Sequence, residues 1–203
     1  MKVALIGATG FIGSRLLAEL TSRGHDVTAI VRNPEKVPAG PKVVAKKGDV
    51  FDAASLGALL KGHDVVISAV HFSASDPKAL IAAAKASGAK RYLVVGGAGS
   101  LEVAPGKKLF DIPEFPAMYL AEAKKGGEFL DLLRDEKDLN WTFFSPAAMI
   151  EPGERTGKFR LGGDQLVANE KGDSRISAED YAVALVDELE TPKHERKRFT
   201  IGY

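Results

Sequence analysis

Cysteine is absent from the 203 residues of the chain. A disulfide scaffold, a thiolate nucleophile and a cysteine-ligated metal or cluster are therefore excluded. Histidine is scarce as well, and the four histidines, at positions 25, 63, 71 and 194, have no paired spacing of the kind that zinc sites use. The sequence predicts no metal site.

Long apolar runs are also missing. No segment approaches the about 18 apolar residues that a membrane span needs, and Met1 to Gly7 is too short for the hydrophobic region of a signal peptide. The formal net charge is only +1, and glutamates offset the basic run Lys193 to Arg198, which we interpret as an exposed turn and strand edge. We expect a soluble, cytoplasmic protein, monomer or homodimer, with no nucleic-acid or membrane partner.

Short apolar runs alternate with longer amphipathic segments over most of the chain. This alternation is typical of βαβ units around a parallel sheet. Strands are expected at 3–6, 27–31, 43–46, 64–68, 91–95, 141–144 and 199–201, and helices at 11–23, 53–60, 77–87, 117–134 and 178–189. The predicted fold is α/β with a doubly wound, mostly parallel sheet, in one domain over residues 1–203 with its core in 1–150.

The pattern changes after Glu151. Glycines at 153, 157, 162 and 163 separate short segments that look like a hairpin rather than another βαβ unit. Ser177 with Asp180 is expected to cap the last helix. Residues 151–203 are therefore predicted to be a hairpin, a final helix and a strand that complete a small appendage on the substrate side.

The loop Gly7-Ala8-Thr9-Gly10-Phe11-Ile12-Gly13 directly follows the first apolar run and opens an amphipathic helix. A glycine repeat alone is weak evidence, but between a strand and a helix it is the dinucleotide-binding arrangement of a Rossmann domain. Gly7 permits the tight turn, Gly10 lets the backbone approach a pyrophosphate, and Gly13 lets helix and strand pack closely. The pyrophosphate is expected at the helix amino terminus, which favours negative charge. The loop therefore predicts a nicotinamide dinucleotide cofactor.

The end of the second predicted strand contains no carboxylate. It reads Ile30-Val31-Arg32-Asn33, whereas domains that prefer NAD use an acidic residue there to hold the ribose 2′-hydroxyl. An arginine pairs instead with a 2′-phosphate, and Lys36 would assist it. NADP(H) is the predicted cofactor, with NAD(H) as the alternative. Arg32 can also be interpreted as a surface arginine without a ligand.

Two further strand ends are candidates for the cofactor. After the third predicted strand, Asp49 would accept from the adenine amino group and Val50 would pack on the ring; alternatively, Asp49 caps the next helix. Ser68, Ala69 and Val70 end the fourth predicted strand beside the topological switch point, where ligands bind in open sheets. Small residues there would let the cofactor lie close.

Taken together, these segments resemble an atypical short-chain dehydrogenase/reductase. Val3 to Gly13 and Val31-Arg32-Asn33-Pro34 carry the general pattern of that superfamily. Three further stretches resemble, more narrowly, the NAD(P)H-binding, NADH-flavin reductase-like group, which is related to biliverdin/flavin reductase and to NmrA-like proteins. They are Val95 to Leu101, Trp141 to Ala147 and Ser174 to Ala182, and the similarity spans nearly the whole chain.

The resemblance implies about six or seven parallel strands, with the cofactor across their carboxyl ends. It implies that Gly96, Gly97 and Ser100 lie near the nicotinamide, together with Ser145 and Pro146. The implied activity is NAD(P)H-dependent reduction of a flavin, a quinone or a similar planar acceptor.

One departure from the superfamily concerns its catalytic pair, Tyr-x-x-x-Lys. Ala123 stands at the fourth place after Tyr119, and Lys124 and Lys125 follow it. Because one residue turns a helical side chain by about 100°, the lysine is not expected to reach the cofactor ribose. A conjugated acceptor demands less of the protein, since the cofactors carry the hard chemistry.

His71, Tyr119 and Ser100 are the catalytic candidates, for positioning or proton delivery; the alternative for each is no chemical role. Phe110, Phe115 and Met118 could wall an aromatic substrate pocket or form the underside of a loop. Two other functions remain open: an NmrA-like, NADP-binding redox-sensing module without turnover, and a sugar-nucleotide epimerase or dehydratase, for which the segment after Glu151 is small.

Overall fold

Eight strands form the central sheet of the computed structural model, which describes residues 1–203. They are β1 Lys2–Ile6, β2 Asp26–Val31, β3 Val43–Lys47, β4 Val65–Ser68, β5 Arg91–Val95, β8 Trp141–Ser145, β10 Arg160–Gly162 and β12 Lys197–Gly202. Their order across the sheet is β10-β12-β8-β5-β4-β1-β2-β3. Every neighbouring pair is parallel except β10 with β12. The predicted doubly wound, mostly parallel sheet is confirmed.

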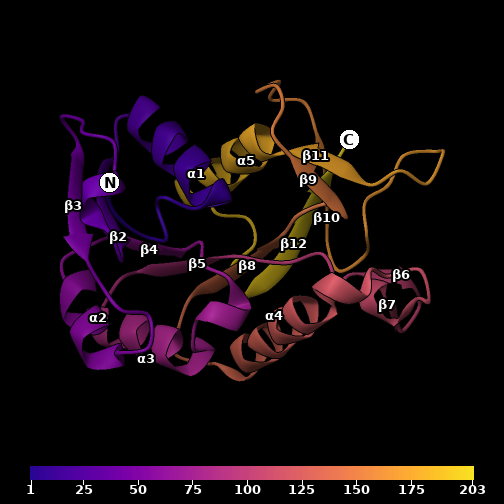
Figure 1. Cartoon of the computed structure of the whole chain (residues 1–203), viewed down its shortest axis with the longest axis horizontal. Helices are drawn as coiled ribbons and strands as arrows, with labels where there is room; N and C mark the ends of the chain where they lie inside the picture. The colour runs from indigo at the N-terminus through magenta and orange to yellow at the C-terminus, as the bar shows by residue number, and fades with distance from the viewer.

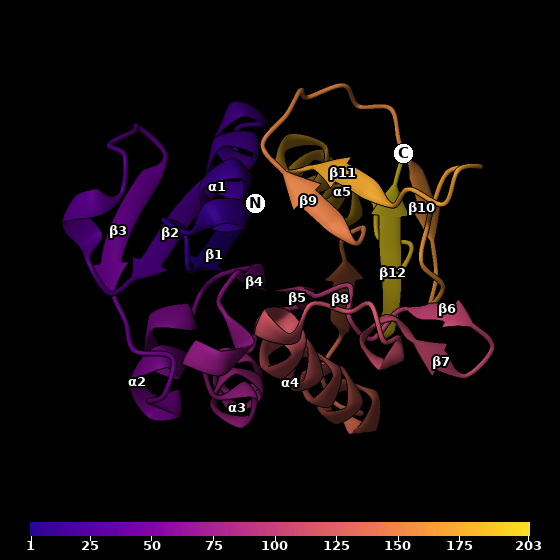
Figure 2. The same ribbon diagram turned by 45° about the vertical axis from the view of Figure 1, so that its right-hand side comes forward.

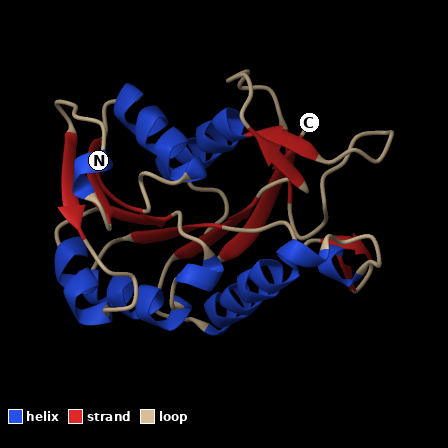
Figure 3. Cartoon of the chain, in the orientation of Figure 1, coloured by secondary structure: helices blue, strands red, loops and turns tan.

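Helices cover both faces of this sheet (Figure 1). One layer consists of α1 (Phe11–Ser22) and α5 (Ala178–Glu190), and the other of α2 (Ala53–Leu60), α3 (Pro77–Ser87) and α4 (Ala117–Asp135). Short 3₁₀ turns occur at Pro34–Lys36, Phe72–Ala74 and Leu109–Asp111. Figure 3 shows the sheet between the two helical layers.

Alternate residues of each strand supply two separate cores. In β1, Val3 and Leu5 pack with α1 and α5, while Ala4 and Ile6 pack with α2, α3 and α4. A parallel strand buried on both faces must be apolar throughout, because successive side chains point to opposite faces. This requirement explains why continuous apolar runs identified the central strands.

Local capping signals set the helix boundaries. The Asp52 carboxylate accepts the Ser55 N–H at 3.0 Å at the start of α2, and the Asp76 carboxylate accepts the Lys78 N–H at 2.9 Å at the start of α3. Gly88 ends α3 in the left-handed conformation, with φ of 70°. All five helices lie where the sequence predicted them.

The topological switch point lies between β1 and β4. From β1 the chain builds the sheet outward through β2 and β3, and it then crosses back to β4 and continues outward through β5, β8 and β12. The loops that follow β1 and β4 therefore leave the same carboxyl edge side by side. Ligands of open α/β sheets bind at this place.

The hairpin expected after Glu151 does not form. Instead, β9 (Met149–Glu151) pairs in parallel with β11 (Arg175–Ser177), and β10 pairs with the distant β12. The cause is a tertiary contact: the buried Asp180 carboxylate accepts the Gly157 N–H at 2.7 Å and the Tyr203 hydroxyl at 2.8 Å. This carboxylate ties the loop after β9 to α5. In Figure 2, β9 and β11 lie on the side of the sheet opposite α4.

A small hairpin occurs between β5 and α4, where the sequence predicted neither a strand nor a helix. It joins β6 (Glu102–Ala104) to β7 (Lys107–Lys108) beside the amino-terminal part of α4. None of the helices is both long enough and apolar enough to span a bilayer.

Candidate functional site

The loop after β1 is shaped by two glycines that no other residue could replace. Gly7 has a φ of +84°, and a Cβ there would lie 2.3 Å from the Ala69 carbonyl oxygen. A Cβ on Gly13 would lie 2.0 Å from the Gly7 carbonyl oxygen. The loop after β1 therefore touches the loop after β4, and α1 packs directly on the turn.

Gly10 serves a different purpose. It is the N-cap of α1 in extended conformation (φ −74°), and no side chain caps the helix. No acidic residue occupies the first turn, so the free N–H groups and the helix dipole offer an uncompensated positive end. Thr9, Gly10 and Phe11 are exposed and Ile12 is half-buried. This cradle fits the pyrophosphate of a dinucleotide.

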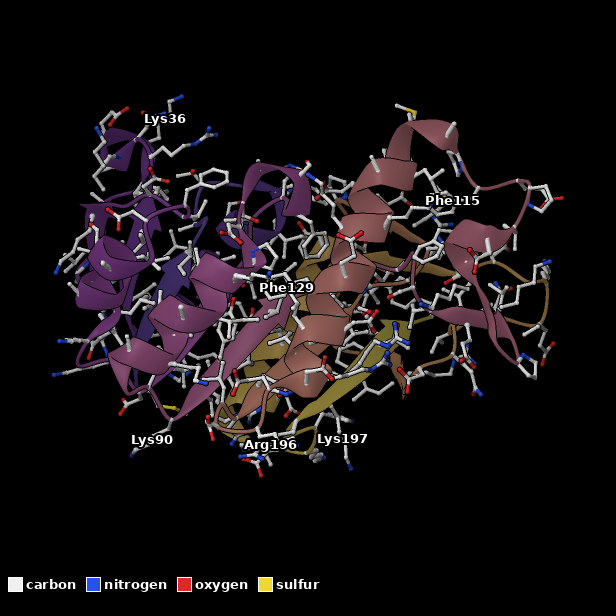
Figure 4. All side chains as sticks on the ribbon, turned by 90° about the horizontal axis from the view of Figure 1, so that it is seen from below. Lys36, Lys90, Phe115, Phe129, Arg196 and Lys197 are labelled. Atoms are coloured by element: carbon white, nitrogen blue, oxygen red, sulfur yellow. The ribbon has the colours of Figure 1, made fainter.

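Arg32 and Lys36 lie at the carboxyl end of β2 and in the 3₁₀ turn that follows. Both side chains are exposed and make no hydrogen bond or ion pair within the chain. Figure 4 shows Lys36 and Phe115 at the edge of the molecule opposite Lys90, Arg196 and Lys197. Two unpaired cations therefore flank the carboxyl edge where an adenosine ribose would lie.

The residues that follow β3 and β4 differ in which polar groups remain available to a ligand. The Asp49 carboxylate accepts the Phe51 N–H at 2.9 Å within a turn, and it does not cap the next helix, because the cap of α2 is Asp52. Val50 packs against the core. The Ser68 hydroxyl is buried and bonded to the Tyr92 hydroxyl at 2.9 Å. Ala69 instead contributes its backbone, which contacts Gly7.

The ends of β5 and β8 meet beside the switch point. A Cβ on Gly96 would lie 2.4 Å from the Phe143 ring, and the Gly96 N–H donates to the Phe144 carbonyl at 2.8 Å. Gly97 packs over Phe72. The chain therefore needs at least Gly96 for its own packing, whatever ligand binds here.

Ser145 ends β8 with a hydroxyl that has no hydrogen-bond partner, although the residue is 0% exposed. Its neighbour Pro146 is buried, and its carbonyl accepts from the Thr200 hydroxyl. An unsatisfied buried hydroxyl costs roughly 1–3 kcal/mol. A polar ligand group at the end of β8 would satisfy it, in agreement with the expected position of the cofactor.

Ser100 is engaged elsewhere. Its hydroxyl is buried and accepts from Arg198 Nη1 at 2.9 Å, and Arg198 Nε in turn donates to the Asp164 carboxylate at 2.7 Å. The structure thus gives Ser100 a partner in an ion-pair network that joins the loop after β5 to β12. The sequence did not reveal this network, because its three members are far apart along the chain.

His71 lies at the carboxyl edge, where its side chain is 84% exposed. Its Nδ1 is 3.4 Å from Oε1 of Glu122 on α4. The two Glu122 oxygens also accept the N–H groups of Phe72 at 2.7 Å and Ser73 at 2.8 Å. Glu122 is a residue that sequence reasoning missed, and it links α4 to the loop after β4.

These contacts affect the ionisation of Glu122. Burial raises its pKa, but the hydrogen bonds from Ser73 and Phe72 and the nearby His71 outweigh burial and hold the pKa below its usual range. Glu122 is therefore a carboxylate at neutral pH, and both of its oxygens accept hydrogen bonds from the loop after β4.

Tyr119 is exposed on the first turn of α4, followed by Ala123 at the fourth place. Lys124 and Lys125 are exposed too. The Tyr-x-x-x-Lys pair is thus absent from the helix that would carry it. Large exposed apolar side chains occur in several segments at this edge: Phe11, Phe51, Met118, Tyr119 and Met149.

Known proteins resemble the chain over its whole length. A family model described as NAD(P)H-binding matches residues 7–192. The Bacillus subtilis protein YwnB, which is uncharacterized, is 44% identical over 211 residues, covering 99% of this chain and 98% of YwnB.

Solved structures agree in fold. A "putative epimerase" from Bacteroides thetaiotaomicron has 47% sequence identity and a TM-score of 0.94, covering 100% of this chain and 96% of that one. A "putative NADH-flavin reductase" from Streptococcus pneumoniae has 39% identity and a TM-score of 0.85, covering 100% and 99%. The matched region of the family model begins at Gly7, the first residue of the loop described above.

Proposed function

Because this chain belongs to the NAD(P)H-binding family, we propose that it is an NADPH-dependent reductase of a flavin, a quinone or a similar planar acceptor. The resemblance to an NADH-flavin reductase-like group supports a reductase, and the solved relative from Streptococcus pneumoniae bears such a name. We further propose that it acts in the cytoplasm, as a monomer or homodimer.

The nucleotide half of the proposed site is made of backbone and cations. The uncapped start of α1 at Gly10 would hold the pyrophosphate, and the unpaired Arg32 would pair with a 2′-phosphate, with Lys36 beside it. Asp49 and Val50 would receive the adenine. Ser145 would offer its unpartnered hydroxyl near the nicotinamide.

The proposed acceptor rests on the side chains that occur at the carboxyl edge of the sheet. It combines exposed apolar side chains, including Phe11, Met118 and Met149, with one His–Glu pair and no Tyr–Lys pair. Apolar and aromatic side chains suit a flat conjugated ring, which stacks on them. A carbonyl or alcohol substrate would require a strong acid/base pair, which this edge lacks.

When bound, NADPH supplies the hydride. The protein must then keep the two rings together and provide a proton to the reduced acceptor. His71 is well placed to deliver this proton, because it is exposed, so that solvent can reprotonate it, and because the Glu122 carboxylate orients its Nδ1. Glu122 also fixes the backbone of Phe72 and Ser73, which prevents the loop from moving away from α4.

The test is a titration of the purified protein with NADPH and NADH, followed by addition of FMN, FAD or menadione while nicotinamide absorbance is recorded. Multiple turnovers with at least one of these acceptors are expected. Tight NADPH binding without turnover would overturn the reductase and favour the redox-sensing module, for which the missing Tyr–Lys pair is the supporting observation. Turnover of a nucleotide sugar instead would support the epimerase alternative that the name of the Bacteroides relative suggests.

A further inference from the structure

A solvent-open cavity of about 530 Å³ lies at the amino edge of the sheet, where β8 and β12 begin. Trp141 and Leu161 are the only hydrophobic residues among the ten that line it. The other eight are Arg134, Gly162, Gly163, Asp164, His194, Arg196, Lys197 and Arg198. Figure 4 shows Arg196 and Lys197 at the edge opposite Lys36 and Phe115, so this cavity is separate from the proposed cofactor site.

Positive charge dominates the lining. Its four arginine and lysine side chains share one lining carboxylate, that of Asp164, and Arg134 also pairs at 3.3 Å with Asp131, which lies outside the lining. Asp164 is already shared, since Arg134 donates to it at 3.0 Å and Arg198 at 2.7 Å. Arg196 and Lys197 are exposed, and their side chains have no partner within the chain. The cavity therefore has cationic groups that no internal anion neutralises.

Part of this lining is rigid and buried. The Arg198 side chain is 3% exposed and is held by the Ser100 hydroxyl and by Asp164. Burial lowers the pKa of Arg198 even though Asp164 acts in the opposite direction. An additional anion in the cavity would stabilise the charged guanidinium.

Two further features concern Trp141 and Arg196, which both line the cavity. The indole N–H of Trp141 is buried without an acceptor, although buried donors are nearly always paired. Arg196 is the only non-glycine residue with a positive φ, at 53°, and its N–H donates to the Trp141 carbonyl at 2.7 Å. Glycine or asparagine would relieve this conformation, whereas the chain has a cationic residue here that lines the cavity.

We propose that this cavity binds a small phosphate-bearing molecule. Its volume lies within the range of about 300–1,000 Å³ typical of small-molecule sites. Arginine side chains match the geometry of phosphate oxygens, and three arginines and one lysine are among the residues that line the cavity. A polynucleotide is disfavoured, because the cations are confined to one concavity of a nearly neutral chain.

Trp141 is the only tryptophan of the chain, so its fluorescence reports on this cavity. Inorganic pyrophosphate is titrated at constant ionic strength, with sodium chloride as the matched salt control. A saturable fluorescence change is expected that sodium chloride does not reproduce. Absence of a saturable change, or an equal change with chloride, would overturn the proposal.

A variant that combines Arg196→Gly with Lys197→Ala removes both unpaired cations and relieves the positive φ, so the fold and its melting temperature are expected to be retained. Pyrophosphate affinity should fall about tenfold or more, as expected for the loss of two charge-assisted contacts. Lys90→Ala, at the same edge but outside the cavity, is the matched control and should have no effect.

Pyrophosphate that binds at the start of α1 would be insensitive to the double variant, so unchanged affinity would overturn the proposal. A short oligonucleotide that binds more tightly than pyrophosphate, and loses affinity in the same variant, would overturn the small-molecule class. Neither outcome depends on whether the protein reduces an acceptor.

Discussion

Nδ1 of His71 lies 3.4 Å from Oε1 of Glu122, and the same carboxylate holds the backbone N–H groups of the two residues that follow His71. One side chain from α4 thus orients an imidazole and anchors the loop that carries it. The pair lies at the carboxyl edge, beside the contact between Ala69 and Gly7.

If His71 delivers the proton, His71→Asn should lower kcat with a quinone or flavin about 100-fold, within the usual range for general acid catalysis. The dissociation constant of NADPH should be unchanged. Glu122→Gln keeps an acceptor oxygen for only one of the two backbone N–H groups and removes the charge beside His71, so a smaller loss of kcat than in His71→Asn is expected. Tyr119→Phe is the matched comparison; a larger loss there than in His71→Asn would transfer the role to Tyr119.

Arg32 provides the second prediction. Arg32→Ala should weaken NADPH binding about 10- to 100-fold through loss of a charge-assisted pair and leave NADH nearly unaffected. Lys36→Ala should have a smaller effect in the same direction. Fluorescence titration of both cofactors measures the ratio, and equal losses for NADPH and NADH would contradict the assignment of Arg32 to a 2′-phosphate.

Replacing Ser145, whose buried hydroxyl has no hydrogen-bond partner, should affect protein stability and cofactor binding differently. Ser145→Ala removes a buried group without a partner, so the free energy of unfolding of the ligand-free protein should stay the same or rise by about 1 kcal/mol. NADPH binding should weaken if the hydroxyl receives the cofactor. A clear loss of stability in urea would show that the hydroxyl has a structural role instead.

Substitution of Gly13 tests how closely α1 packs against the loop after β1. A Cβ at Gly13 would approach the Gly7 oxygen to 2.0 Å, whereas a Cβ at Gly163 would have no neighbour within 4 Å. Gly13→Ala should therefore cost more than about 2 kcal/mol of unfolding free energy by backbone displacement, and Gly163→Ala should change it by less than about 0.5 kcal/mol. Similar urea midpoints for the two variants would refute this packing.

The buried pair of Arg91 and Glu188 predicts acid sensitivity. Glu188 lies 3.1 Å from Arg91 and also accepts from the backbone of Lys193 and His194. Burial raises its pKa, but these hydrogen bonds, including those from His194 and Arg91, outweigh it, and the pKa lies below 4.5. Since the folded pKa is depressed, this stabilisation is present above about pH 4.5 and is lost as the pH falls through the folded pKa.

Glu188→Gln should lower the free energy of unfolding at pH 7 by about 3 kcal/mol, because it leaves Arg91 buried without its counter-charge. The difference in stability between pH 7 and pH 3 should shrink in this variant. Glu170→Gln, at an exposed position, is the control and should keep the wild-type pH dependence. An unchanged pH dependence in Glu188→Gln would exclude Glu188 as its source.

Most of the fold could be predicted from the sequence because the signals are local. The apolar run Val3 to Ile6, the cap Asp52 and the stop Gly88 each act within one turn or strand. The nucleotide loop is local as well: strand, turn and helix are continuous from β1 to α1, so Gly7 to Gly13 indicated the NAD(P)H-binding family that the comparisons confirm.

The remainder depends on contacts between distant segments. Glycine spacing after Glu151 predicted a hairpin, but the Asp180 carboxylate in α5 captures that loop and leaves β10 to pair with β12. Ser100 follows a strand end as an expected catalytic residue would, yet Arg198 from β12 occupies its hydroxyl.

Neighbouring residues along the chain were enough to predict the five helices, seven of the eight strands of the central sheet, the dinucleotide loop and the arginine at the end of β2. Three features could be seen only in the folded chain: Glu122 orients His71, the Ser145 hydroxyl lacks a partner, and one cavity is lined by Arg134, Arg196, Lys197 and Arg198. These contacts join residues that are far apart along the chain and become neighbours only when the sheet and its helices assemble, so no local sequence pattern predicts them.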